Sequence, residues 1–208
     1  MRWRNPLSRR ATIGRLLALG AVGGMPRMAR AERRVGLCAD VSLAAYGFPP
    51  PHPFAPERQA EFLREAARRG LLARAVAQGA RVARVDELTR FHTAEYVARV
   101  QAAPAAGERA LDAGDTPVFA GIHEAAARVV GTALDACAEI VDGRLDASFQ
   151  PIGGLHHAHR DRASGFCVYN DCGVVIETLR RVHGIRRIAY VDIDAHHGDG
   201  EFYAFEDD

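Results

Sequence analysis

Residues 187–200, RIAYVDIDAHHGDG, join an apolar run to a dense group of ionisable side chains. Residues 187–193 are predicted to form one buried strand, because apolar and β-branched residues dominate until the carboxylates begin near its end. The ionisable side chains then fall within eight residues: Asp192, Asp194, His196, His197 and Asp199. Ligands in α/β sheets gather outside the carboxyl ends of the strands, so a site is expected here.

The spacing of these residues suits a metal ion. Side chains alternate along a strand, so Asp192, Asp194 and His196 are expected on one side of it. A carboxylate and an imidazole two residues apart can share one divalent cation. Mixed oxygen and nitrogen ligands are typical of catalytic zinc, which keeps one position open for water. The alternative is a solvated turn that carries several charges.

A second predicted strand, 147–152, also runs into glycines and histidines, with GGLHH at 153–157. The paired glycines allow a tight turn, on which His156 and His157 can face one cleft. A histidine can move a proton between a metal-bound water and a leaving amine, while a carboxylate behind it fixes its tautomer. The two histidine groups together indicate amide hydrolysis.

The remaining histidines are predicted to be surface or packing residues: His52, His92, His123, His159 and His183. His159 is assigned to a solvated loop, because the charged residues 160–162 follow it.

Composition restricts the possible classes of protein. The chain has 208 residues, of which 48% are hydrophobic, enough for one sizeable domain with a buried core. Its net charge of +1 offers no electrostatic case for nucleic-acid binding. The four cysteines have neither zinc-ribbon nor disulfide-framework spacing and are expected to be reduced. No apolar run is long enough to span a membrane.

Residues 1–32 are treated separately from the fold. Arg9 and Arg10 precede a weakly apolar stretch, 16–25, and Ala-Arg-Ala at 29–31 ends the segment. This pattern is typical of a twin-arginine export signal, although a short basic extension or an upstream start codon gives the same composition. We expect a cytoplasmic protein, with export as the alternative, and assign 33–208 to the folded domain.

Strand and helix patterns alternate along the rest of the chain. Strands are predicted at 34–38, 80–85, 147–152 and 187–193. Helices are predicted at 56–69, from 86, from 93, at 119–141 and from 170 to about 183, with Thr93 and Asn170 or Asp171 as caps. This alternation indicates an α/β domain with a parallel sheet and helices on both faces.

Four segments resemble the histone deacetylase superfamily, which includes acetoin-utilisation proteins and acetylpolyamine amidohydrolases: 153–158, 163–167, 170–171 and 190–200. Weaker similarity lies at 52–54 with Arg58 and at 91–93 with Tyr96. Together the matches cover about 34–208. The resemblance implies a three-layer arginase/deacetylase-like fold with a mostly parallel central sheet. Manganese hydrolases of arginase type fit less well, because they rely on clustered aspartates rather than a histidine pair.

The resemblance also implies roles for individual residues. Asp194 and His196 would bind a zinc ion (Zn2+). His157 would be the main general base and acid, and His156 would stabilise charge. Asp192 would support His156, and Asp199 would support His157.

Further roles concern the surroundings of this site. Gly165 and Phe166 would line a narrow channel for an acetyl-lysine-like or acetylpolyamine substrate. A structural potassium ion (K+) would be held by Asp192, Asp194 and His196, partly through backbone carbonyls. Arg58 would lie near an internal cavity below the metal. No nucleic-acid or membrane partner is implied.

The sequence departs from the family pattern near its end. The family has a third zinc ligand, an aspartate on a later strand, and a downstream tyrosine that holds the substrate carbonyl. Tyr203, Asp207 and Asp208 lie too close to the 190–200 motif to replace them. We therefore expect the amino-terminal portion of a deacetylase domain without its later strands. The alternative is a catalytically inactive remnant.

Overall fold

A three-stranded parallel sheet forms the centre of the part that the computed structural model describes, residues 33–208. The central strand β1 (Val35–Cys38) pairs in parallel with β2 (Val76–Gln78) on one side and β3 (Ala147–Phe149) on the other. The predicted α/β class with a parallel sheet is confirmed. The predicted signal or basic extension, 1–32, lies outside the described residues. No helix in 33–208 is both long and apolar enough to cross a membrane.

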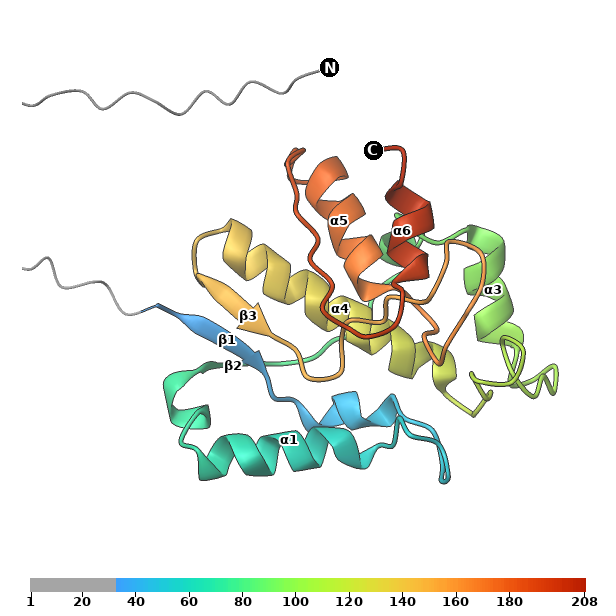
Figure 1. The fold of residues 1–208 in the computed structure, drawn as a ribbon, viewed down its shortest axis with the longest axis horizontal. Helices are drawn as coiled ribbons and strands as arrows, with labels where there is room; N and C mark the ends of the chain where they lie inside the picture. Colours follow the sequence, from blue (N-terminus) through green and yellow to red (C-terminus); the bar gives the residue numbers. More distant parts are fainter. Residues whose placement is uncertain (1–32) are drawn as a thin grey trace, which may run out of the picture. The chain divides into compact units, whose positions relative to one another are not determined.

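Helices cover both faces of this sheet (Figure 1). Helix α1 (Glu57–Arg68) lies on one face, where the ring of Phe62 stacks on that of Phe149 with centroids 5.3 Å apart. Helix α4 (Ile122–Val141) lies on the other face and contacts β1 and β3. The remaining helical elements are η1 (Val41–Ala45), η2 (Leu72–Arg74), α2 (Val85–Leu88), α3 (Ala94–Ala102), α5 (Asp171–Arg181) and α6 (Asp199–Phe205).

Two of the predicted helix caps are present. The Thr93 hydroxyl accepts the N–H of Tyr96 at 3.2 Å and begins α3. The Asn170 side chain accepts the N–H of Gly173 at 2.7 Å and begins α5. Each side-chain oxygen satisfies a backbone donor that the first helical turn leaves without a partner.

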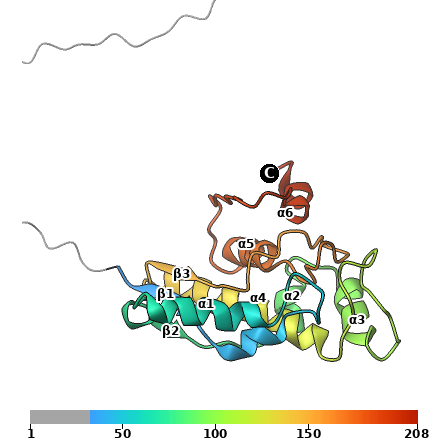
Figure 2. The ribbon, with the colours of Figure 1, turned by 60° about the horizontal axis from the view of Figure 1, so that its bottom comes forward.

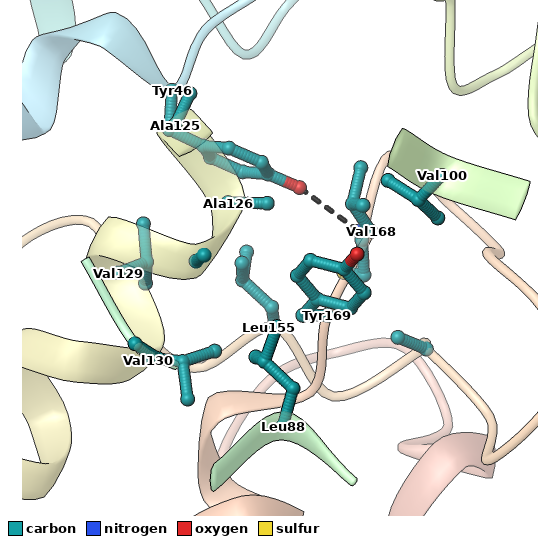
Figure 3. Close-up of a cluster of buried hydrophobic side chains, with 14 of the residues drawn as sticks. Tyr46, Leu88, Val100, Ala125, Ala126, Val129, Val130, Leu155, Val168 and Tyr169 are labelled. Atoms are coloured by element: carbon teal, nitrogen blue, oxygen red, sulfur yellow. Dashed lines mark hydrogen bonds between the residues drawn. The ribbon is translucent and has the colours of Figure 1, made fainter. Parts of the chain in front are cut away.

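The core forms where α4 packs against the loops that lead to the site (Figure 3). The buried residues of α4 are mostly alanine and valine, so neighbouring segments can approach the helix closely. At Gly131 an added Cβ would come within 2.4 Å of the Arg81 carbonyl oxygen. Tyr46 is buried in this core, and its hydroxyl accepts the N–H of Val168 at 3.0 Å.

The prediction of a strand at 80–85 is wrong. The second strand lies earlier, at Val76–Gln78, and residues 79–84 are irregular. The Ala83 N–H bonds to the Ala127 carbonyl of α4 at 2.9 Å, and the Ala80 N–H bonds to Asp40 at 3.2 Å. These backbone donors are used by a helix and a side chain, so the segment crosses α4 and pairs with no strand.

The prediction of a buried strand at 187–193 is also wrong. Residues 185–193 have no regular structure, and Val191 and Ile193 are 78% and 95% exposed. Figure 2 shows this connection running past α5 toward α6 without lying alongside a strand. A β-branched apolar run becomes a strand only when another strand accepts its backbone hydrogen bonds. Within 33–208, β3 pairs with β1 alone.

Candidate active site

The turn that carries His156 and His157 is held by one buried carboxylate. Asp171, the first residue of α5, accepts the N–H of Leu155 at 2.8 Å and that of Gly154 at 3.0 Å. Gly154 adopts a φ of +82°, which favours glycine. Burial raises the pKa of Asp171, against the opposing effect of these backbone donors. The motif 153–157 therefore takes its shape from a carboxylate that sequence reasoning assigned only to helix capping.

Each of the adjacent histidines bonds to its own aspartate. His156 Nδ1 lies 2.6 Å from Asp192 Oδ2, and His157 Nδ1 lies 2.7 Å from Asp199 Oδ1. A carboxylate accepts from the Nδ1–H tautomer, which leaves Nε2 with the lone pair that a base needs. The two imidazole centroids are 4.2 Å apart, so both rings belong to one site.

The charge of both aspartates is stabilised where they meet the histidines. The bond from His156 lowers the pKa of Asp192. Burial raises the pKa of Asp199, but bonds from His157 and His159 outweigh it, so the net direction is downward. Both carboxylates are therefore ionised near neutral pH and can stabilise a protonated imidazole.

Two glycines let the backbone come close to these pairs. A Cβ on Gly198 would lie 2.5 Å from Asp192 Oδ2, and one on Gly165 would lie 2.7 Å from the ring of His157. Gly165, at a φ of +52°, belongs to the pair of residues predicted to line the channel. Phe166, the other, has a φ of +54°, and its carbonyl accepts the Tyr46 hydroxyl at 2.6 Å.

The Phe166 side chain packs in an aromatic group with Phe54 and His52. Its ring centroid lies 5.5 Å from that of Phe54 and 5.4 Å from that of His52. Arg58, which we expected near an internal cavity, places its guanidinium carbon 4.6 Å from the Phe54 centroid. Arg58 and Phe166 therefore contact the same aromatic ring, that of Phe54.

The expected metal ligands, Asp194 and His196, lie on the exposed connection between α5 and α6. His196 Nδ1 is 2.8 Å from Asp194 Oδ1, and the two side chains are 76% and 53% exposed. Hydrogen bonds from the His196 backbone N–H and ring lower the pKa of Asp194. Among residues 33–208, no group of three His, Cys, Asp or Glu side chains is arranged to hold a metal. These residues thus offer a pair of suitable donors, one short of the three protein ligands of a catalytic zinc site.

His159 was assigned to a solvated loop, and that assignment is wrong. Its side chain is only 12% exposed, and its Nε2 lies 3.1 Å from Asp199 Oδ2. Charged neighbours suggested solvent, but the turn directs Arg162 back toward the imidazole ring, 3.1 Å from Nδ1. The useful signal in the sequence was its spacing, two residues after His157.

Comparison with known proteins gives a consistent result. Residues 52–208 match the profile of the histone deacetylase domain. The acetoin utilization protein AcuC of Bacillus subtilis is 43% identical over 134 residues, covering 61% of this chain and 34% of that protein. Histone deacetylase 2 of Oryza sativa subsp. japonica is 36% identical over 184 residues, covering 84% of this chain and 36% of that protein.

Solved structures show the same relationship. The crystal structure of an HDAC homolog from Aquifex aeolicus superimposes with a TM-score of 0.70 at 32% identity, covering 83% of this chain and 48% of that one. An HDAC homolog complexed with SAHA superimposes with a TM-score of 0.69 at 31% identity. The predicted arginase/deacetylase-like fold is confirmed. The chain spans about half the length of these solved relatives, and about a third of the two curated ones.

Proposed function

Because the chain belongs to the histone deacetylase family, we propose that residues 33–208 carry the tandem-histidine part of a zinc-dependent deacetylase. The substrate is the amide of an acetyl-lysine-like side chain or of an acetylpolyamine. The observation that carries this proposal is the pair of hydrogen bonds from His156 to Asp192 and from His157 to Asp199. They prepare two adjacent imidazoles for proton transfer.

In this proposal the two histidines divide the work of amide hydrolysis. His157 takes a proton from the attacking water through Nε2 and returns it to the leaving amine, while Asp199 stabilises the imidazolium between these steps. His156, the more buried of the two, stabilises the negative charge that develops on the substrate oxygen when its Nε2 also carries a proton, with Asp192 as the counter-charge of the imidazolium. A zinc ion, when bound, polarises the substrate carbonyl and acidifies the attacking water.

Asp194 and His196 supply a share of the metal site. Their oxygen and nitrogen donors match a mixed zinc ligand set, but the pair by itself is insufficient for tight binding. We expect the 208-residue chain to retain well under one zinc ion per molecule after dialysis, and Asp194→Asn to reduce that amount further. One tightly held zinc per chain would contradict this expectation.

The proposal is tested by turnover of an acetyl-lysine peptide and of an acetylated polyamine with zinc supplied in excess. His157→Ala should abolish release of acetate, because the proton carrier is lost. The matched control is His183→Ala, because His183 lies outside the site. Since a solved HDAC homolog was complexed with SAHA, this compound is a suitable test ligand to add to the assay. Equal rates for His157→Ala and the wild type would show that the role is misassigned.

A second candidate is a chain that has the deacetylase fold but no turnover. It is favoured by the absence, within 33–208, of a three-residue metal group. The same assay separates the candidates: no acetate above the His157→Ala background supports the non-catalytic alternative.

A further inference from the structure

We propose that His159 is a positioning residue that holds His157 through their shared partner, Asp199. This inference rests on the proposed function of His157. Asp199 Oδ1 accepts a hydrogen bond from His157 Nδ1 at 2.7 Å, and Asp199 Oδ2 accepts one from His159 Nε2 at 3.1 Å. Both oxygens of one carboxylate are thus engaged by imidazoles two positions apart in the sequence.

The contacts of His159 define its tautomer. His159 Nε2 lies 3.1 Å from Asp199 Oδ2, and an ionised carboxylate can only accept, so Nε2 carries the ring proton. One nitrogen of the Arg162 guanidinium lies 3.1 Å from both Nδ1 and Nε2, so it rests against the ring and does not distinguish the two ring nitrogens.

Local packing fixes the position of the His159 ring. The backbone N–H of His159 donates to the backbone carbonyl of Arg162 at 3.0 Å, and this hydrogen bond closes the turn. The ring lies nearly parallel to that of Tyr203, at 14° and with centroids 6.3 Å apart. Tyr203 belongs to α6, the helix that begins at Asp199, so aspartate and histidine are tied to one element.

The consequence for His157 follows from the geometry of the carboxylate. With both oxygens bonded, Asp199 cannot turn about its side-chain bonds without breaking one contact. The Asp199 carboxylate is therefore held in the orientation in which it accepts a hydrogen bond from His157 Nδ1–H. As a result, His157 keeps the tautomer whose Nε2 can accept a proton. Without His159, Asp199 Oδ2 becomes available to water, and His157 is expected to populate both tautomers.

The test is nitrogen-15 NMR of the imidazole groups in the full 208-residue chain. In the wild type at mildly alkaline pH, His159 should show Nε2–H and His157 should show Nδ1–H. His159→Ala should give a tautomer mixture at His157. His159→Gln should restore the wild-type pattern, because its amide group can still donate to Asp199. His183→Ala is the matched control and should change neither ring.

Turnover provides a second readout in any form that hydrolyses substrate. His159→Ala should lower kcat by about tenfold at unchanged KM, the lower end of the loss that follows when an outer hydrogen-bond partner is removed. His159→Gln should recover most of it. A general structural defect would not be rescued by an amide donor.

Failure of this inference and failure of the proposed function give different results. If wild-type His159 carries its proton on Nδ1, or if His159→Ala leaves His157 as Nδ1–H, the inference is overturned whatever the activity. If His159→Ala does not fold, the wild-type His159 spectrum decides alone. If the tautomers behave as expected but no acetate is released, the positioning role holds and only the proposed function fails.

Discussion

Gly198 lies against the carboxylate of Asp192 so closely that a Cβ at position 198 would come within 2.5 Å of Asp192 Oδ2. The same Cβ would lie 3.1 Å from His156 Nδ1, so it would meet both atoms of the His156–Asp192 hydrogen bond. An alanine at this position must displace one of the two side chains. The pair therefore depends on a backbone position without a side chain of its own.

Gly198→Ala is predicted to break the His156–Asp192 bond while leaving the domain folded. In the nitrogen-15 spectrum, the chemical shift of the His156 Nδ1–H should move to that of an imidazole without a carboxylate partner. Turnover should fall tenfold or more. Gly79→Ala is the control, because a Cβ at that position would have no atom within 4 Å. An unchanged His156 signal in Gly198→Ala would show that the backbone can adjust.

Asp171→Ala is predicted to destabilise the histidine turn. The change leaves the N–H groups of Gly154 and Leu155 without their acceptor, and the unsatisfied N–H of the buried Leu155 should lower the free energy of unfolding by about 1–3 kcal/mol. Urea unfolding should report this loss, and turnover should fall because the histidines are no longer held in place. Asp171→Asn keeps one acceptor oxygen and should lose less in both measurements. Equal stability of Asp171→Ala and the wild type would contradict the bracing role.

Glu201 is predicted to make stability depend on pH. Its carboxyl is buried in the first turn of α6, and burial together with Asp171 and Asp192 raises its pKa to about 8. The unfolded chain releases this proton near pH 4.5, the ordinary value. The free energy of unfolding should therefore fall between about pH 4.5 and 8, by at most about 1.4 kcal/mol per pH unit.

Glu201→Gln should remove this contribution, because the amide does not ionise. The variant should be more stable than the wild type near pH 8 and show a weaker decline from pH 5 upward in urea unfolding. Glu206→Gln, at the exposed position that directly follows α6, is the control and should leave the pH profile unchanged. Parallel profiles for Glu201→Gln and the wild type would exclude the predicted effect.

Ile193 is predicted to promote self-association. It is 95% exposed, and Val191 beside it is 78% exposed. Exposed apolar residues on a segment with strand-forming composition favour contacts between chains. Ile193→Ser should reduce the apparent mass in concentration-dependent light scattering. Val41→Ser is the matched control, because Val41 is 75% exposed in η1, away from this connection. A smaller reduction for Ile193→Ser than for Val41→Ser would refute this explanation.

Local sequence was sufficient for elements whose signals lie within a few residues. The Thr93 and Asn170 caps and the end of α1 near Gly70 follow from local hydrogen bonds and backbone freedom. Strand positions were less predictable, because a strand depends on a partner that is distant in the sequence. Residues 80–85 and 187–193 had suitable composition, but neither pairs with a strand in the described structure.

The sequence by itself determined the fold class and the two histidine–aspartate motifs of the candidate site, because motif spacing and strand–helix alternation are local properties. Only the tertiary structure decided which side chains meet. It placed His159 beside Asp199 and Asp171 beneath the histidine turn, and it left Asp194 and His196 as an exposed pair. The physical reason is that hydrogen bonds across 16 to 42 residues depend on how helices and loops pack, which no local pattern specifies.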